Sequence, residues 1–438
     1  MVIITEKKHC CGCGACAQKC PKQSISMVED KEGFLYPVVD ETTCINCGLC
    51  KKVCHELYSY SERRPLRVLA TINKSDEIRK KSSSGGMFHS LAEKVLSQNG
   101  IVFGAKFDKN WNVVIDYVEE IDAVSALMGS KYVQAKVGNT YRQAEEFLKK
   151  GRLVLYSGTP CQITGLLHFL NREYDNLITV DVVCHGVPSP KVWRLYLNEI
   201  TCAVNNITNV NFRKKQYGWK KFNFQIEYKD GNIVSISSPH FQNDYMRAFL
   251  SNLILRPSCY DCKAKGGRSK SDITIADFWG VEKDMPEMDD DGGTSLVLIN
   301  TKKGESIVDY SRLKYKECTL QQMLDNNMCF AHSVKEHSKR ASFFKSIDKD
   351  INIISLINKS LRPPLKARTI IKLRSLKNKC MEIAKYVWGG VPPKNKLDNM
   401  SNVAEKTCHN YEISNISFRE KINGWKHYNF QITFDNDN

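Results

Sequence analysis

The chain has 438 residues, which is enough for two or three domains with a sizeable core. Its hydrophobic content is 42%, and no apolar run approaches the roughly 20 residues needed to cross a bilayer, which argues against an integral membrane protein. The formal charge is +16, and 18 cysteines are present. Because the first residues lack the apolar core of a signal peptide, we expect a cytoplasmic protein whose cysteines bind metal and do not form disulfides.

The positive charge is concentrated towards the carboxyl end. Residues 331–400 contain 16 Lys and Arg against 5 Asp and Glu, which supplies +11 of the total. Such a stretch is typical of a solvated helix face or of a surface that binds an acidic protein, an anionic membrane or nucleic acid. We favour the first two over nucleic acid, because no nucleic-acid-binding motif accompanies the charge. Peripheral membrane contact and a homo-oligomer stay open.

Two motifs with the spacing C-x2-C-x2-C-x3-C occupy the amino-terminal 54 residues. They consist of Cys10, Cys13, Cys16 and Cys20, and of Cys44, Cys47, Cys50 and Cys54. In two-cluster ferredoxins three cysteines of each motif bind one [4Fe-4S] cluster and the fourth binds the other cluster. The spacing therefore predicts one cluster on Cys10, Cys13, Cys16 and Cys54, and a second on Cys44, Cys47, Cys50 and Cys20. Zinc is the alternative, but tetrahedral zinc sites do not require the C-x3-C spacing that occurs in both motifs. Cys11 is a spare thiol, and the second motif ends on His55 where the first has the closing proline Pro21.

The order of apolar runs predicts an α+β ferredoxin domain at 1–60 and a mixed α/β domain at 66–330. Strands are expected at 25–28 and 35–40 in the first domain. In the second we expect strands at 66–73, 101–105, 113–115, 152–156, 177–183 and 295–299, and helices at 88–96 and 140–150. A small-residue loop before the helix at 88–96 can bind an anion through backbone N–H groups, although an ordinary helix cap explains it equally well.

Cysteines follow two of these strands directly. Cys161 lies in the turn after 152–156, and Cys184 follows 177–183. Because α/β sheets bind ligands at the carboxyl ends of their strands, both thiols are expected at a binding edge. With the C-x2-C pair Cys259 and Cys262 they supply the four thiolates that a third [4Fe-4S] cluster needs. From the residues alone, zinc and an uncoordinated group of core cysteines are equally open.

A repeat links the middle of the chain to its end. Residues 207–232 and 413–438 are identical at 13 of 26 positions, and their alternating pattern predicts a half-buried strand. The first copy runs through a turn into 233–236 and so predicts a hairpin. We hypothesise that the second copy, 411–438, pairs with an exposed sheet edge of the same subunit or of a dimer partner. Between the copies, 331–410 is expected to be a basic, mainly helical tail.

Six motifs within 66–330 resemble the beta-subunit family of the coenzyme F-420 (deazaflavin) hydrogenases and dehydrogenases. They lie at 84–86, 129–134, 157–162, 184–189, 256–262 and 272–280. The resemblance implies an iron–sulfur flavoprotein with FAD, and some members of the family carry a fused ferredoxin domain. It raises Cys161, Cys184, Cys259 and Cys262 to expected ligands of a third cluster. The FAD contacts that it suggests are Ser84, Gly85, Gly86, Lys131, Tyr132, Ser157, Gly158, Thr159 and Gln162.

The function implied by this resemblance is an oxidoreductase. Electrons would run from an external ferredoxin, or another acidic electron-transfer protein, through the clusters to FAD and on to an organic acceptor. The acceptor would be the deazaflavin coenzyme or an intermediate of cell-envelope polysaccharide synthesis. His185 and Asp277 are the candidate proton donors, with hydrogen bonding near a cluster and orientation of backbone as their alternative roles. The rival function is a non-catalytic electron-transfer subunit that docks through its basic tail.

Overall fold

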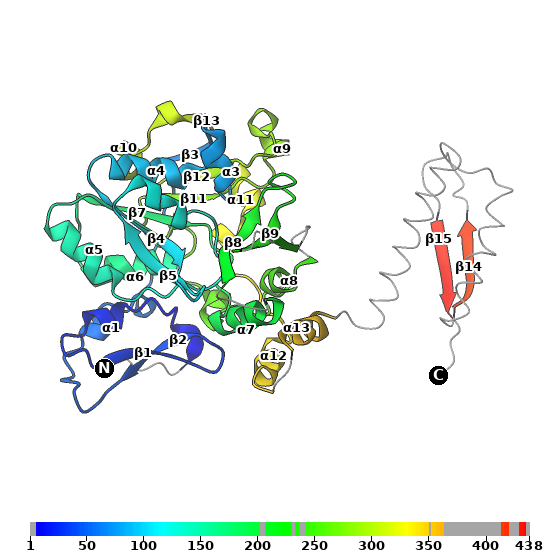
Figure 1. Ribbon diagram of the computed structural model, residues 1–438, viewed down its shortest axis with the longest axis horizontal. Helices are drawn as coiled ribbons and strands as arrows, with labels where there is room; N and C mark the ends of the chain where they lie inside the picture. Colours follow the sequence, from blue (N-terminus) through cyan, green and yellow to red (C-terminus); the bar gives the residue numbers. More distant parts are fainter. Residues whose placement is uncertain are drawn as a thin grey trace. The chain divides into compact units, whose positions relative to one another are not determined.

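The computed structural model describes residues 6–201, 206–229, 233–236, 242–349 and 352–362, and the strands at 413–419 and 429–434. The chain divides into two units, Met1–Leu361 and Arg362–Asn438 (Figure 1). Of the predicted basic tail, 363–410 lies outside the described residues. No helix in the described part of the chain is long and apolar enough to cross a membrane.

The amino-terminal segment has the ferredoxin-like arrangement that the motifs predict. It comprises α1 (Ala15–Lys19), β1 (Ile25–Glu29), β2 (Leu35–Val39) and α2 (Leu49–Lys52), with β1 and β2 paired antiparallel. Each helix starts after a glycine in the left-handed region, Gly14 at φ +73° and Gly48 at φ +75°. Both glycines directly follow the second cysteine of their motif, so the repeated sequence produces the same local turn twice.

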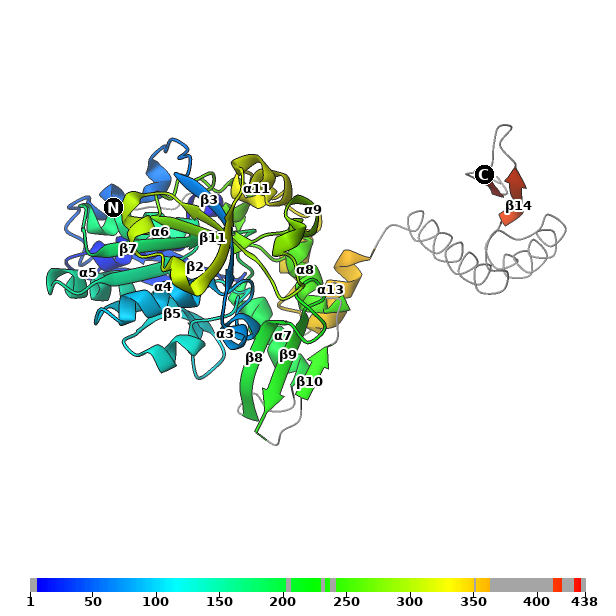
Figure 2. The ribbon, with the colours of Figure 1, turned by 90° about the horizontal axis from the view of Figure 1, so that it is seen from above.

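An eight-stranded mixed sheet forms the centre of the first unit, in the order β13-β3-β12-β11-β7-β6-β4-β5 (Figures 1 and 2). Its strands are β3 (Arg67–Asn73), β4 (Ile101–Phe107), β5 (Val113–Val118), β6 (Val154–Gly158), β7 (Leu177–Val182), β11 (Ile273–Asp277), β12 (Ser295–Ile299) and β13 (Leu313–Glu317). Strands β4, β6, β7 and β11 are parallel to one another. The carboxyl ends of β6, β7 and β11 therefore meet at one edge of the sheet, and the mixed α/β prediction is confirmed.

Helices precede, connect and follow these strands. They are α3 (Asp76–Lys81), α4 (Met87–Leu96), α5 (Thr140–Lys149), α6 (Pro160–Leu170), α7 (Pro190–Ile200), α8 (Asp244–Leu250), α9 (Val281–Asp284), α10 (Lys302–Ser306), α11 (Leu320–Asn326), α12 (Arg340–Ser346) and α13 (Ile353–Leu361). Helix α6 begins with a capping box, in which Thr159 and Gln162 bond to each other's backbone, and with Pro160 in its first turn.

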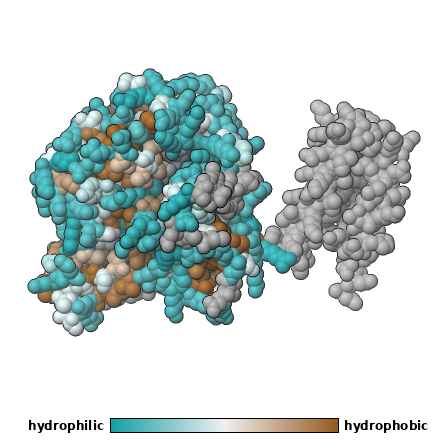
Figure 3. All heavy atoms as spheres, viewed as in Figure 1, coloured by the Kyte–Doolittle hydropathy of each residue, from teal (hydrophilic) through white to brown (hydrophobic). Residues whose placement is uncertain are grey.

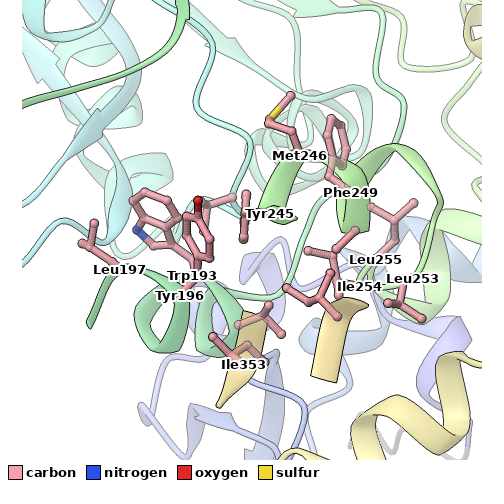
Figure 4. Close-up of a cluster of buried hydrophobic side chains, with 14 of the residues drawn as sticks. Trp193, Tyr196, Leu197, Tyr245, Met246, Phe249, Leu253, Ile254, Leu255 and Ile353 are labelled. Carbon is pink, nitrogen blue, oxygen red and sulfur yellow. The ribbon is translucent and has the colours of Figure 1, made fainter. Parts of the chain in front are cut away.

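A large apolar core joins the ferredoxin-like segment to the rest of the unit. Trp193 and Tyr196 of α7 pack against Tyr245 of α8, as Figure 4 shows, and Phe249 of α8 and Ile353 of α13 belong to the same core. Phe34 and Tyr36, next to and within β2, belong to this core as well. The first unit thus continues past residue 330 to Leu361, since the start of the predicted tail folds as helices α12 and α13.

The two copies of the repeat share one strand register. In the first copy, β8 (Ile207–Lys214), β9 (Asn223–Tyr228) and β10 (Ile233–Ile236) form a three-stranded sheet, with Val210 opposite Ile226. In the second, β14 (Ile413–Arg419) pairs with β15 (Asn429–Phe434), and the corresponding Ile416 lies opposite Ile432. The antiparallel pairing of β9 with β10 agrees with the predicted hairpin. Pairing of the second copy with another sheet edge stays a prediction.

Candidate functional site

Nine cysteines of the ferredoxin-like segment line two hollows: the eight motif cysteines and, in the first hollow, Cys11. Cys10, Cys13, Cys16 and Cys54 line the first hollow, and Cys20, Cys44, Cys47 and Cys50 line the second hollow. Each hollow combines three cysteines of one motif with the last cysteine of the other. These are the sets that the ferredoxin spacing predicts for two clusters.

The two hollows differ in their surroundings. At the second hollow Cys47 is exposed and the Ile45 side chain is 57% exposed. Figure 3 shows a largely hydrophilic face with apolar groups at the lower left, where Figure 1 places the ferredoxin-like segment. The first hollow lies against helix α6: a Cβ on Gly165 would come within 3.0 Å of Cys13 Sγ and 2.9 Å of the Tyr141 hydroxyl. The first hollow therefore faces the interior of the unit, and the second faces solvent.

A further group of cysteines, the inner thiols, gathers at the carboxyl edge of the sheet. Its members are Cys161 in the first turn of α6, Cys184 after β7, and Cys259 and Cys262 around the short 3-10 helix Pro257–Asp261. Burial raises the pKa of the Cys259 and Cys262 thiols to about 12, and the neighbouring cysteines of the group add to this effect. Burial likewise raises the pKa of Cys184, with the other three cysteines acting in the same direction. The parallel pairing of β6 and β7 is what brings Cys161 and Cys184 together.

A buried cation accompanies the inner thiols. The Lys265 side chain is packed within the fold, with the residue 4% exposed, and its ammonium group donates to the backbone oxygens of Cys184 and Cys329. Among the described residues it forms no ion pair with a carboxylate. A buried charge without a counter-charge is costly. Anionic sulfur at the inner thiols is the nearby group that would balance it, because Lys265 opposes the rise in the Cys184 pKa.

Cys11 connects the first hollow with the inner thiols, a position that the motif spacing did not reveal. Its Sγ lies 3.0 Å from His55 Nε2, and both residues are buried. The contact with Cys13, followed by burial, raises the pKa of Cys11, and the contact with Cys11 raises the pKa of Cys161. Donor atoms of Cys11, Cys13 and His55 lie within 4.8 Å of one another. Only two signals of this contact are present in the sequence: Cys11 is adjacent to the first motif, and a histidine occupies position 55.

Two of the three predicted groups of FAD contacts lie side by side. The Ser83 hydroxyl accepts a hydrogen bond of 2.7 Å from the Ser130 backbone N–H, which joins the loop at 84–86 to Lys131 and Tyr132. Within the loop, a Cβ on Gly85 would lie 2.3 Å from the Thr71 carbonyl oxygen, so glycine is required. Lys131 Nζ donates to the backbone oxygen of Met128 at 2.8 Å, and burial lowers its pKa to about 7.

The third group, Ser157 to Gln162, uses its polar side chains inside the protein. The Ser157 hydroxyl donates to the Phe103 carbonyl at 2.8 Å, and Gln162 Oε1 accepts from the Thr159 backbone N–H at 2.9 Å. The Ser84 hydroxyl is similarly bonded, to the Thr294 carbonyl at 2.7 Å. These side chains shape the turn at the sheet edge, and direct contact of any of them with FAD stays a prediction.

The two predicted proton donors are both held by neighbours. His185 Nε2 lies 2.7 Å from Asn252 Oδ1, and its Nδ1 lies 3.5 Å from Cys329 Sγ. Asp277, at the end of β11, accepts two hydrogen bonds from Arg213, at 2.8 and 3.1 Å, and one from Trp219 at 3.1 Å. Both side chains are thus used in structural contacts, and their catalytic roles stay predictions.

Arg213 and Arg256, like Lys265, lie near the site and were not selected by sequence reasoning. Arg213 is 4% exposed and also donates to the Tyr132 hydroxyl at 3.0 Å, which connects a predicted FAD contact with Asp277. Arg256 is fully buried between the ferredoxin-like segment and the C-x2-C pair. Signals existed for both: Arg213 is one of the identities shared by the two repeat copies, and Arg256 opens the motif at 256–262.

Comparison with known proteins identifies two parts of the chain. Residues 9–56 match the model of a 4Fe-4S dicluster domain, and residues 151–322 match the model of the carboxyl-terminal part of the coenzyme F-420 hydrogenase/dehydrogenase beta subunit. An uncharacterised ferredoxin of Methanocaldococcus jannaschii is 36% identical over 52 residues, which are 12% of this chain and 66% of that protein. The solved F-420-reducing [NiFe] hydrogenase complex from Methanosarcina barkeri contains a chain with 18% identity and a TM-score of 0.42, covering 61% of this chain and 91% of its own.

The matched ranges coincide with the structural groups. The dicluster match contains both hollows, and the beta-subunit match contains all four inner thiols. The chain therefore combines an iron–sulfur dicluster domain with a domain of the coenzyme F-420 hydrogenase/dehydrogenase beta-subunit family.

Proposed function

We propose that this chain is an iron–sulfur flavoprotein oxidoreductase that transfers electrons from a reduced ferredoxin to FAD and on to an organic acceptor. The observation that carries the proposal is the inner thiol group. Four cysteines from three separate parts of the sequence converge at the sheet edge beside Lys265, a buried cation without a carboxylate partner among the described residues. Four thiolates are the ligand set of a [4Fe-4S] cluster.

The residues present fit three clusters. The first hollow, the second hollow and the inner thiols each offer four cysteines, and no disulfide ties up any of them. When bound there, clusters would supply one-electron transfer, and FAD would couple it to two-electron chemistry. The protein's own contribution is the order of the sites, because Cys11, which lines the first hollow, also contacts Cys161 of the inner thiols.

The FAD site that we propose lies around the joined segments 83–86 and 130–132, near the Arg213–Asp277 pair. Three features support it: the glycine loop that admits no side chain at Gly85, the position of Asp277 at the carboxyl end of β11, and the contact of Arg213 with Tyr132. Ligands bind at this edge in open α/β sheets. By the family description, the deazaflavin coenzyme is the first candidate acceptor, and a cell-envelope polysaccharide intermediate is the second.

Electrons would enter at the second hollow, which faces solvent. Lys22, Lys51 and Lys52 are exposed near it, together with Ile45. A basic rim around a small apolar patch suits an acidic electron-transfer protein, since complementary charge speeds the encounter while apolar contact holds the complex.

Anaerobic purification with iron, acid-labile sulfide and flavin quantified together tests the proposal. We expect about twelve irons and one flavin per chain. The variant Cys262→Ser should lose about four irons, whereas Cys318→Ser, at a half-buried thiol outside the three sites, should lose none. About eight irons in the unmodified protein, unaffected by Cys262→Ser, would remove the third cluster from the proposal. Absence of flavin would remove electron transfer through FAD from the proposal.

A second candidate is a non-catalytic electron-transfer subunit of a larger redox complex. Two observations favour it: the matched family is one of beta subunits, and both predicted proton donors are occupied by neighbours. Turnover of reduced ferredoxin with a small acceptor by the purified chain alone would exclude this candidate. Strict dependence on an added partner protein would support it.

A further inference from the structure

A second buried cation lies beside the first hollow. Arg256 is fully buried, and its guanidinium donates three hydrogen bonds: from Nε to the Cys10 carbonyl at 2.7 Å, from Nη1 to Gln134 Oε1 at 3.0 Å, and from Nη2 to the Leu35 carbonyl at 2.9 Å. All three acceptors are neutral. Within the described part of the chain Arg256 forms no ion pair with a carboxylate.

The surroundings are shaped to accept this side chain. Gly12, in the loop between Cys10 and Cys13, has φ +74°, and a Cβ there would lie 2.8 Å from Arg256 Nη1. The Tyr36 ring covers the guanidinium, with its centroid 4.3 Å from Cζ. Gln134 also donates to the Cys11 carbonyl at 2.9 Å, so the loop that carries the first two cysteines is held from two sides. Packing of this kind leaves the charge little access to water.

A buried guanidinium needs negative charge nearby, and the first hollow is where it would come from. Cys10 lies directly against Arg256, because its carbonyl oxygen accepts the 2.7 Å hydrogen bond from Nε, and Gly12, two residues on, approaches Nη1. Thiolates bound to a cluster would place permanent negative charge at this position.

We propose that Arg256 is a positioning residue that raises the reduction potential of a cluster in the first hollow and fixes the Cys10–Cys13 loop against the beta-subunit domain. Adding one electron to such a cluster increases the negative charge beside the guanidinium, and an adjacent buried positive charge makes that addition more favourable. No proton or further reactant is needed. The inference rests on the proposed cluster in the first hollow.

The test is a redox titration of the anaerobically purified full chain, with dithionite as electron donor and EPR as the readout. In Arg256→Gln we expect the ratio of reduced to oxidised cluster at a fixed potential to fall about tenfold for one cluster, a shift of about 59 mV. The component from the second hollow should not move. Arg256→Lys, which retains a positive charge, should keep the potential of the unmodified protein within about half that shift.

Arg340→Gln is the matched control. Arg340 is also buried, bonds the Leu255 carbonyl at 3.0 Å and reaches the ferredoxin-like segment, but there it pairs with Glu32. Its loss should leave every potential unchanged. The proposal is overturned if Arg256→Gln loads its iron and titrates like the unmodified protein, or if Arg256→Lys shifts as far as Arg256→Gln. Should Arg256→Gln fail to load iron, Arg256→Lys alone decides, and a fall of about 59 mV or more in its first-hollow potential would overturn the proposal.

Iron and sulfide analysis separates this inference from the proposed function. If the unmodified chain holds no cluster on Cys10, Cys13, Cys16 and Cys54, the proposed function fails before any potential is measured. If the cluster is present and its reduction potential is the same with and without Arg256, only the role of Arg256 is refuted.

Discussion

The substitution Asp277→Asn distinguishes a catalytic carboxylate from one that supports the fold. Asp277 receives two hydrogen bonds from Arg213 and one from Trp219, and the Arg213 side chain is only 3% exposed. Asparagine preserves the shape but removes the charge, and its amide N–H2 group would face one of the donors. Leaving one member of a buried ion pair uncompensated costs about 3 to 5 kcal/mol. At roughly 2 °C per kcal/mol for larger domains, the melting temperature should fall by about 6 °C or more.

The assay compares thermal unfolding and turnover in the same preparations. Glu62→Gln is the control, because Glu62 also pairs with an arginine, Arg268, but the two side chains are 64% and 30% exposed. A solvent-exposed pair contributes about 0 to 1 kcal/mol, so this control should melt within about 2 °C of the unmodified protein. If Asp277→Asn abolishes turnover with an unchanged melting temperature and unchanged iron content, the structural role is wrong and Asp277 is the proton donor.

Three further outcomes follow from the contacts of the site. Gly165→Ala should place a Cβ against Cys13 and destabilise the unit by about 1 to 3 kcal/mol. The measurement is the rate at which a chelator removes iron, which should be faster than in the unmodified protein. Thr164→Ala, on the same helix, should lose iron at the rate of the unmodified protein. Cys11→Ala should retain about twelve irons, because the two hollows and the inner thiols each have four cysteines other than Cys11. A loss of about four irons would show that Cys11 is a cluster ligand. In Lys52→Glu an acidic ferredoxin should reduce the chain about twofold or more slowly at low salt, and the difference from the unmodified protein should shrink as salt is added. Lys302→Glu should be reduced at the rate of the unmodified protein.

The parts of the site that were predictable share a local pattern in the sequence. The two cysteine motifs specify their fold by spacing alone, and each recurs with a glycine that starts a short helix, so the grouping of Cys20 with Cys44 follows from the spacing. The apolar run before each of Cys161 and Cys184 likewise predicted two strand ends. Parallel neighbouring strands then bring such ends together without further information.

What the sequence could not supply are contacts between segments far apart in the chain. Arg256 is 246 residues from Cys10, and Arg213 is 64 residues from Asp277. No periodicity connects such pairs, because their distance depends on how the ferredoxin-like segment and β8 pack against the sheet. The same limit explains Cys11, which lies outside the motif spacing although its thiol contacts two cysteines of different sites.

The buried cations give the three sites an order that the cysteines alone do not. The second hollow faces solvent, and the arginine that touches it, Arg142, is only partly buried where it donates to the Cys20 carbonyl. Arg256 adjoins the first hollow, and Lys265 adjoins the inner thiols. Because buried positive charge favours the more negative, reduced form, Arg256 should raise the potential of a cluster in the first hollow and Lys265 that of a cluster at the inner thiols. Both cations would thus favour the inward transfer of electrons that enter at the surface, and loss of Arg256 would make the transfer into the first hollow less favourable.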